Sequence, residues 1–213
     1  MELGLREVGD DEPVYIILGD TIADFKKDTI LDPDGNYLGL IRVADPRRFG
    51  VAIVKGSRVI ELEEKPDHPR SDLALAGVYY IGKPKLLKKA LTRLYEQKIK
   101  TKGEFQLTDA LALMLSEGIE FNWFPLTEWL DCGTPKTLLE TNKLLLERNL
   151  SYPEGLSKKN IIISPVYIEE DVNIEGSIIG PYVSIGKGTE IERSVVENSI
   201  IGSNVSLSCC LLN

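Results

Sequence analysis

The stretch Val14-Tyr15-Ile16-Ile17-Leu18-Gly19-Asp20 is the first indication of the fold. Five apolar or aromatic residues follow one another without a polar break, and the run ends in Gly-Asp. An amphipathic helix would place polar residues every few positions and a half-exposed strand would alternate, so the run predicts a strand buried on both faces. Because ligands of open α/β sheets bind beyond the carboxyl ends of such strands, Asp20 would lie at the rim of a site and could hold a divalent cation. The alternative interpretation of Asp20 is a turn or a helix cap.

Composition limits the class of protein. The 213 residues suffice for one large core or two smaller ones, and the 33 acidic and 25 basic residues give a net charge of −8. That balance argues against nucleic acids and anionic membranes as partners, because both require basic surfaces. No apolar run is long enough to span a bilayer, and the first residues do not form a signal peptide. Three cysteines, Cys132, Cys209 and Cys210, are too few for a disulfide framework, so we expect a cytoplasmic protein.

The pattern of apolar and turn residues over 1–150 predicts an α/β domain. Apolar residues at helical spacing predict helices from Pro84, over 108–118 and over 136–148. The end of a further helix is expected before residue 9, and a short helix over 21–27. Strands are expected over 37–43, 76–81, 119–126 and 128–130, with a hairpin formed by 50–54 and 58–64.

A different pattern follows the predicted linker at 151–160. Apolar residues recur six apart in three series, namely Ile162, Ile168, Ile174; Ile179, Ile185, Ile191; and Val195, Ile201, Leu207. Glycine directly follows three of these residues, at positions 180, 186 and 202. A period of six with glycine at the corners predicts a parallel β-helix over 161–213, with about 18 residues in each coil and roughly three coils.

Three clusters of residues could carry chemistry. They are Leu18-Gly19-Asp20, Phe49-Gly50 together with Glu63-Glu64-Lys65-Pro66, and Trp129-Leu130-Asp131-Cys132-Gly133-Thr134. Two carboxylates brought together suit Mg²⁺, which takes one or two protein carboxylates plus phosphate oxygens. A lysine can neutralise a phosphate, and a glutamate can accept hydrogen bonds from sugar hydroxyls. Most acidic residues of the chain are expected to form a solvated surface instead.

The order of the motifs is more specific than any one of them. Leu-Gly-Asp, Phe-Gly-Val-Ala, Glu-Glu-Lys-Pro, Ala-Gly-Val-Tyr-Tyr, Gly-Glu-Phe-Gln-Leu-Thr-Asp and Trp-Leu-Asp-Cys-Gly-Thr-Pro occur in sequence and are followed by hexapeptides. This arrangement resembles the sugar-phosphate nucleotidyltransferases, most closely the long glucose-1-phosphate thymidylyltransferases. The resemblance implies a partial Rossmann-like nucleotidyltransferase domain followed by a short left-handed parallel β-helix.

The resemblance also implies roles for individual residues. Asp20 and Asp131 would bind Mg²⁺, and with Lys65 they would form the catalytic set. Glu64 would accept sugar hydroxyls, Lys65 would contact the sugar phosphate, and Gly50 would contact the sugar. Tyr79 would line the phosphate side. Lys102 stands where the family often has arginine, so it would supply a charge without the bidentate fork.

One family feature is absent from the sequence. The Gly-rich loop ending in Thr-Arg-Leu, which cradles the nucleoside triphosphate, does not occur, so we expect that the N-terminal third of the catalytic domain is missing. The expected function is a nucleotidyltransferase that converts glucose 1-phosphate and dTTP to dTDP-glucose and pyrophosphate, or a truncated form of one. The alternative is a non-catalytic fragment that binds sugar phosphate or forms a homo-oligomer through the β-helix or an uncovered sheet. A hexapeptide acyltransferase is a third possibility, disfavoured because those enzymes rely on a histidine base and none lies between residues 151 and 213.

Overall fold

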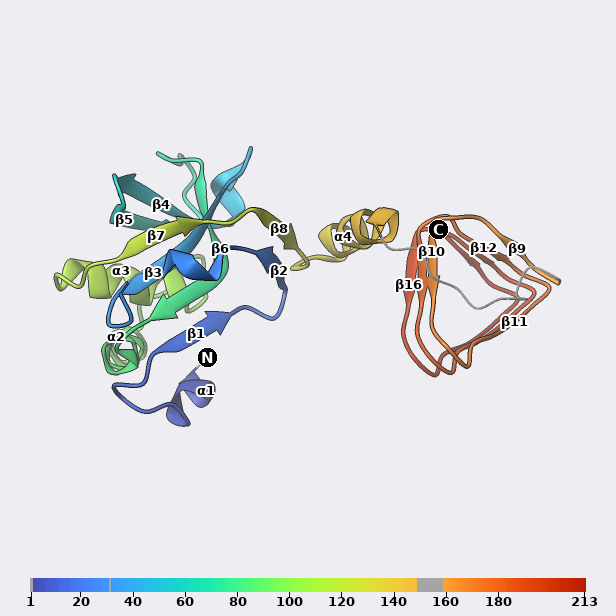
Figure 1. Cartoon of the computed structure of the whole chain (residues 1–213), viewed down its shortest axis with the longest axis horizontal. Helices are drawn as coiled ribbons and strands as arrows, with labels where there is room; N and C mark the ends of the chain where they lie inside the picture. The colour runs from blue at the N-terminus through green and yellow to red at the C-terminus, as the bar shows by residue number, and fades with distance from the viewer. Residues whose placement is uncertain (1, 31, 149–158) are drawn as a thin grey trace. The chain divides into compact units, whose positions relative to one another are not determined.

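A computed structural model describes residues 2–30, 32–148 and 159–213 (Figure 1). The chain divides into two compact units, Met1–Leu130 and Asp131–Asn213. The predicted linker lies almost entirely outside the described residues, and the predicted domain boundary at residue 150 stays a prediction. Among the described residues, none of the helices combines the length and the apolar character needed to cross a bilayer.

The first unit is built on a six-stranded sheet. Its order is β1 (Val14–Ile17), β6 (Leu73–Ile81), β3 (Asn36–Arg42), β7 (Asn122–Pro125), β5 (Arg58–Glu64) and β4 (Gly50–Lys55). The β3–β7 pair is parallel, whereas the pairs β1–β6, β3–β6, β5–β7 and β4–β5 are antiparallel. The predicted hairpin is confirmed as β4–β5. Two short 3-10 helices, η1 (Lys27–Thr29) and η2 (Pro46–Arg48), lie in the connections.

Two apolar clusters cover the two faces of this sheet. On one face, helices α2 (Pro84–Glu96) and α3 (Leu107–Ser116) bury the leucines predicted from their helical spacing, among them Leu87 and Leu111, against strand residues such as Leu38. On the other face, Tyr37, Val78, Tyr80 and Phe124 form a smaller cluster that includes partly buried Phe25 and Trp129. All nine residues of β6 are buried because both clusters meet on it.

The prediction that the first strand is buried on both faces is wrong. β1 pairs with β6 on one side only, and the exposed fraction is 45% for Tyr15 and 57% for Ile17. Val14 and Ile16 pack against the core beneath the helices, whereas Tyr15 and Ile17 lie on the opposite face; a continuous apolar run does not show whether another layer packs on each face of the strand. The expected helix end before β1 is confirmed as α1 (Glu2–Arg6).

The predicted helix over 21–27 is also wrong. Residues Thr21–Asp24 form strand β2, which pairs with β8 (Glu128–Asp131) in a separate two-stranded sheet. The Thr127 N–H donates to the Asp24 carbonyl over 2.9 Å and continues this pairing. A partner about a hundred residues away in the chain therefore decides the structure of a segment whose own pattern is too short to decide it.

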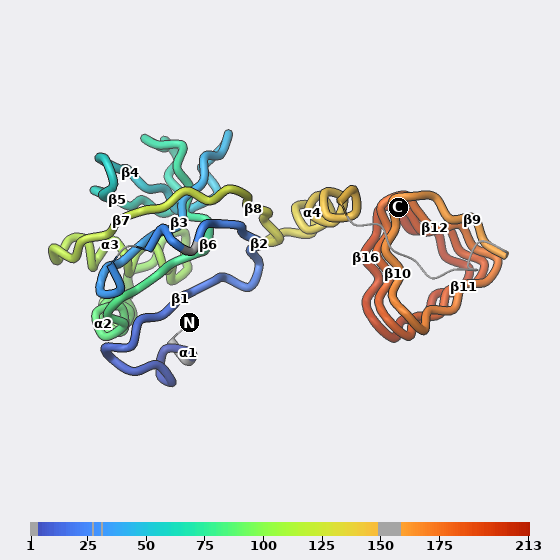
Figure 2. The backbone as a smooth tube through the Cα atoms, viewed as in Figure 1, coloured from blue at the N-terminus to red at the C-terminus, as the bar shows by residue number. Residues whose placement is uncertain are grey.

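The second unit combines helix α4 (Pro135–Arg148), close to the predicted helix, with a parallel β-helix. Ser184 Oγ donates to Asn142 Oδ1 over 2.6 Å, and the Lys143 ammonium lies 5.2 Å from the Tyr182 ring centroid, so α4 packs on the β-helix. In the β-helix successive coils stack on one another (Figure 2), and their parallel strands form three sheets, one on each side of the coil. Their strands are β10 (Val166–Ile168), β13 (Val183–Ile185) and β16 (Ser199–Ile201); β11 (Asn173–Glu175), β14 (Glu190–Glu192) and β17 (Ser206–Ser208); and β9 (Ile161–Ile162), β12 (Ile178–Ile179), β15 (Val195–Val196) and β18 (Leu211–Leu212).

The coils are shorter than the predicted 18 residues. Val166 pairs with Val183, which pairs with Ser199, so successive coils advance by 17 and then 16 residues. The coils lose residues at their corners. As a result Val196, and not the predicted Val195, occupies the inward-facing position and is fully buried. At the Gly180 corner a Cβ would lie 1.8 Å from the Ile163 carbonyl oxygen and φ is +100°, so only glycine fits there.

Candidate functional site

The hairpin β4–β5 brings Gly50 and Glu64 together, because Gly50 begins β4 and is in register with Glu64 at the end of β5. A Cβ on Gly50 would lie 2.5 Å from Thr108 Oγ1 and 3.0 Å from Glu64 Oε2. Thr108, in the first turn of α3, also hydrogen-bonds the Glu64 carboxylate. These three residues form a tight polar cluster, with the Glu64 side chain only 6% exposed.

Burial raises the pKa of the Glu64 carboxyl, while the hydrogen bond from Thr108 and the charge of Lys65 oppose that shift. A carboxylate kept in place by these partners can accept hydrogen bonds from hydroxyl groups of a ligand. Burying this carboxylate costs less free energy when a ligand or a neighbouring residue donates a hydrogen bond to it.

Two predicted phosphate ligands lie on neighbouring segments. Lys65 has a positive φ of 44°, and its ammonium is 3.7 Å from Glu64 Oε1 and 3.8 Å from Glu104 Oε2. Lys102, with φ 51°, occupies a tight turn closed by the Thr101–Glu104 bridge and pairs with Asp67 at 3.2 Å. The segment around Lys65 and the turn around Lys102 therefore exchange ion pairs, which places both cations in one region of the first unit.

Tyr79 connects this region with Asp20. Its side chain is 3% exposed and belongs to the cluster beneath α2 and α3. Burial raises the pKa of the Tyr79 hydroxyl, and the charges of Glu64 and Asp20 raise it further. The charges of Asp20 and Glu64 therefore both act on Tyr79, and Asp20 is exposed.

Asp20 and Asp131 occupy the ends of paired strands. Asp20 directly precedes β2, Asp131 is the last residue of β8, and the two strands pair. The Asp131 Oδ1 accepts the Gly133 N–H over 2.8 Å. Because Asp131 is also the first residue of the second unit, the convergence of the two carboxylates on one ion stays a prediction.

Their chemistry fits Mg²⁺, since both are carboxylates, on an exposed and a half-buried residue respectively. No group of three or more His, Cys, Asp or Glu side chains with metal-binding geometry occurs among the described residues. An ion at Asp20 and Asp131 would therefore depend on phosphate or water oxygens for its remaining ligands, which is usual for Mg²⁺.

Sequence reasoning missed two residues near this site, Thr108 of the cluster and its neighbour Asp109. Both belong to the motif Gly-Glu-Phe-Gln-Leu-Thr-Asp, which served only as a family marker. Asp109 Oδ1 accepts a hydrogen bond from Thr101 Oγ1 over 3.1 Å, so it anchors the turn that carries Lys102. Burial raises the pKa of the Asp109 carboxyl. A polar pair at the start of an otherwise apolar helix was the available signal.

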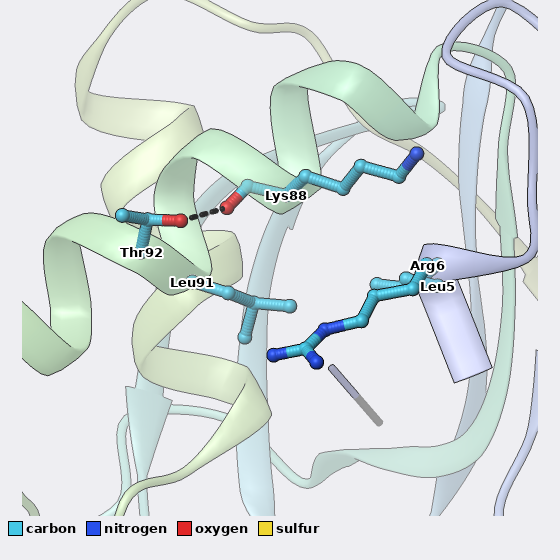
Figure 3. Close-up of a pocket in the computed structure, with 5 residues that line it drawn as sticks. All are labelled: Leu5, Arg6, Lys88, Leu91 and Thr92. Atoms are coloured by element: carbon cyan, nitrogen blue, oxygen red, sulfur yellow. Dashed lines mark hydrogen bonds between the residues drawn. The ribbon is translucent and has the colours of Figure 1, made fainter. Parts of the chain in front are cut away.

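A separate pocket of about 270 Å³ lies between α1 and α2 (Figure 3). It is lined by Leu5, Arg6, Lys88, Leu91 and Thr92, and the Thr92 hydroxyl donates to the Lys88 carbonyl over 3.0 Å. The Lys88 ammonium donates to the Val8 carbonyl and pairs with Asp10 over 2.9 Å, so its charge is already compensated. None of the predicted site residues lines this pocket.

Comparison with known proteins agrees with the motif order. The model of the nucleotidyl transferase family matches residues 8–148. A glucose-1-phosphate thymidylyltransferase from Streptomyces griseus is 34% identical over 87% of this chain and 51% of its own length. A glucose-1-phosphate adenylyltransferase from Lachnospira eligens is also 34% identical, over 91% of this chain and 46% of its own.

A solved structure is similar as well. It is assigned as a glucose-1-phosphate thymidylyltransferase from Bacillus anthracis in complex with a sucrose, and it aligns with a TM-score of 0.55 and 28% identity over 72% of this chain and 61% of that one. The chain thus spans about half the length of the curated relatives it matches.

Proposed function

Because this chain belongs to the nucleotidyl transferase family, among the sugar-1-phosphate nucleotidyltransferases, we propose that it binds glucose 1-phosphate at Gly50, Glu64 and Lys65 and serves the transfer of a thymidylyl group from dTTP to it. The observation that carries this proposal is the tight cluster of Gly50, Glu64 and Thr108. Thr108 and the backbone at Gly50 hold the Glu64 carboxylate, which is 6% exposed, in one place, and the Lys65 ammonium lies 3.7 Å from it, so a hydroxyl acceptor and a cation for a phosphate stand side by side.

In the proposed reaction an oxygen of the sugar phosphate attacks the α-phosphorus of dTTP, and pyrophosphate leaves in line. Glu64 accepts hydrogen bonds from two sugar hydroxyls and so fixes the sugar. Lys65 and Lys102 neutralise phosphate charge as point charges. Tyr79 closes the buried side of the site and excludes water there.

Mg²⁺ fits the carboxylates of Asp20 and Asp131, and when bound it would supply positive charge to the phosphate oxygens. Asp20 and Asp131 would hold that ion, and the hydrogen bond from the Gly133 N–H orients the Asp131 carboxylate. Lys65, as the third member of the catalytic set, stabilises the charge that spreads over the phosphate in the transition state.

The choice of glucose and thymidine comes from relatives rather than from contacts of this chain. Relatives named as thymidylyl- and adenylyltransferases of glucose 1-phosphate are equally identical to it, so dTTP and ATP are both to be tested. A cytoplasmic location is proposed on the sparse cysteines, which are free in the structure.

The test is release of pyrophosphate by the full chain, supplied with glucose 1-phosphate, Mg²⁺ and each of the four nucleoside triphosphates in turn. We expect release with dTTP that Asp20→Asn and Lys65→Ala each reduce by at least about a hundredfold, in keeping with loss of a charge that acts in the transition state. Release that is unaffected by both substitutions would contradict the assigned site.

A second candidate function is sugar-phosphate binding without turnover. One observation favours it. The chain covers about half of the length of each curated relative, and the predicted sugar-phosphate residues lie in the part of the chain that matches. Binding of glucose 1-phosphate without pyrophosphate release by any triphosphate would select it. Absence of both binding and release would overturn both candidates.

A further inference from the structure

The first turn of α3 contacts both parts of the proposed sugar-phosphate site. Thr108 hydrogen-bonds the carboxylate of Glu64, the proposed acceptor of sugar hydroxyls. Its neighbour Asp109 accepts the Thr101 hydroxyl at Oδ1 over 3.1 Å, and Thr101 begins the turn that carries Lys102, a proposed phosphate ligand. Two consecutive residues of one helix therefore connect the group that would hold the sugar with a group that would hold the phosphate.

The backbone of the turn that carries Lys102 is unusual. The N–H groups of Thr101 and Glu104 each donate to the carbonyl of the other residue, over 3.0 and 3.1 Å, so only Lys102 and Gly103 lie between them. Both central residues have positive φ, 51° at Lys102 and 88° at Gly103, as in a two-residue type I′ turn. Glycine adopts positive φ readily, whereas a lysine does so where its surroundings hold it there. The conformation of Lys102 therefore depends on contacts at the ends of the turn.

Two contacts of the turn are ion pairs at the surface. Glu104 Oε2 lies 3.8 Å from the Lys65 ammonium. The Lys102 ammonium lies 3.2 Å from Asp67 Oδ1. The Glu104 and Asp67 side chains are 72% and 84% exposed, and ion pairs of such exposed groups contribute little. The hydrogen bond to Asp109 joins two half-buried residues, where water competes less for the donor and the acceptor, so it is the contact that fixes the turn.

Asp109 carries its charge at a cost to stability. Burial raises the pKa of its carboxyl, and its Oδ2 atom is buried without a hydrogen-bond partner in the part of the chain that the structure describes. The positive end of the α3 dipole favours a carboxylate in the first turn, which accounts for an acidic residue there but not for its hydrogen bond to Thr101. The cost and the hydrogen bond together indicate a role for Asp109 in holding the turn.

We propose that the Thr101–Asp109 hydrogen bond fixes Lys102 relative to the sugar-binding carboxylate and thereby selects sugars phosphorylated on C1 over sugars phosphorylated on C6. This inference rests on the proposed function, the binding of glucose 1-phosphate at Glu64 and Lys65. Because the lysine stem is flexible, the position of its backbone sets the range that the ammonium reaches. A sugar held by its hydroxyls at Glu64 presents a phosphate on C6 in a different place from a phosphate on C1. A turn without its anchor would let the Lys102 ammonium follow the phosphate to either place.

The specificity is measured by calorimetric titration of the full chain with glucose 1-phosphate and with glucose 6-phosphate. We expect the dissociation constant for glucose 6-phosphate to be higher by at least about tenfold in the unmodified chain. Thr101→Val keeps the shape of the side chain but removes the donor, so it should lower this ratio by at least about fivefold. Thr101→Ser retains the hydroxyl and should restore the ratio. The matched control is Thr92→Val on α2, which removes a hydroxyl that donates to the Lys88 carbonyl over 3.0 Å and should leave the ratio unchanged.

A double-mutant cycle separates positioning of the lysine from general destabilisation. Lys102→Ala should lower the ratio by itself, and adding Thr101→Val to it should change the ratio by less than about twofold, because the anchor acts through the lysine that is gone. Asp109→Ala should reproduce the effect of Thr101→Val; if it fails to fold, Thr101→Val decides alone. A full further loss on adding Thr101→Val to Lys102→Ala would overturn the proposal.

Amide hydrogen exchange, followed by nuclear magnetic resonance, tests the anchor without any ligand. The Glu104 N–H donates to the Thr101 carbonyl over 3.1 Å, so its exchange reports whether the turn is closed. We expect Thr101→Val to speed this exchange at least about fivefold and Thr101→Ser to leave it unchanged. Unchanged exchange or an unchanged ratio in folded Thr101→Val would overturn the inference and leave the proposed function intact. Failure of the unmodified chain to bind either sugar phosphate would overturn the proposed function and this specificity together.

Discussion

Replacing Gly50 by alanine tests how tightly the candidate site is packed. The added Cβ would lie 2.5 Å from Thr108 Oγ1, 2.7 Å from Leu75 Cδ1 and 3.0 Å from Glu64 Oε2. Thr108 and Leu75 are 5% and 6% exposed, so neither can move freely out of the way. The methyl group must therefore displace the Glu64 carboxylate or distort the start of β4.

Overpacking of this kind costs about 1–3 kcal/mol. For a unit of this size, that corresponds to a fall in melting temperature of roughly 3–10 °C. Displacement of Glu64 should in addition weaken glucose 1-phosphate binding by at least about tenfold, because a hydrogen bond to a charged group contributes about 1.5–3 kcal/mol.

The unfolding of the first unit can be followed by itself. Both tryptophans of the chain, Trp123 and Trp129, lie in Met1–Leu130, so tryptophan fluorescence during urea unfolding reports on that unit alone. Gly19→Ala is the control, since a Cβ there meets no atom within 4 Å, and it should change stability by less than about 0.5 kcal/mol. If Gly50→Ala matches this control in both stability and sugar-phosphate affinity, the packing argument is refuted.

Three further predictions concern charge and hydrogen bonding. Burial raises the pKa of Glu64 above the ordinary 4.5, so its neutral form should bind sugar hydroxyls less well and glucose 1-phosphate affinity should fall as pH drops, starting above pH 4.5; calorimetry should show a flatter profile for Glu64→Gln, in which only the phosphate titrates. Asp20→Asn and Asp131→Asn should each weaken Mn²⁺ binding, followed by electron paramagnetic resonance in the presence of glucose 1-phosphate, by at least about tenfold, and a loss confined to one of them would count against a shared ion. Ser194→Ala should destabilise the second unit by about 1–3 kcal/mol in thermal unfolding, because it leaves the N–H of Cys210 without its acceptor; an unchanged melting temperature would contradict this account of the corner.

The raised pKa of Glu64 also makes the folding free energy depend on pH. Its pKa is higher in the folded chain than in the unfolded one, so the free energy of unfolding receives its full contribution from this group below pH 4.5 and loses it as pH rises through the folded pKa. The carboxylate is therefore retained at neutral pH at a cost to stability, which fits a binding role better than a structural one.

Features with a local period could be predicted from the sequence. The six-residue repeat predicted the β-helix because each coil buries the same positions, and the leucine stripes predicted α2 and α3. The hairpin of β4 and β5 followed from two apolar runs around a short turn. Each of these patterns depends on neighbours within a few residues, or one coil, of each other.

Features that depend on distant neighbours could not be predicted. The exposure of Ile17 depends on which elements pack on its face of β1, and the strand at Thr21–Asp24 depends on β8. The contact of Thr108 with Glu64 joins a helix and a strand whose packing no local pattern encodes. The coil length of 16 or 17 residues reflects corner geometry, which the six-residue period alone does not define.

Calorimetric titration of the full chain with glucose 1-phosphate, compared with glucose and with inorganic phosphate, tests the proposed site most directly. We predict saturable binding of one molecule, weaker by at least about tenfold for either part alone and for Glu64→Ala, because the sugar and the phosphate contact different side chains. Binding of inorganic phosphate as tight as that of glucose 1-phosphate, or no loss in Glu64→Ala, would contradict a site built around this carboxylate.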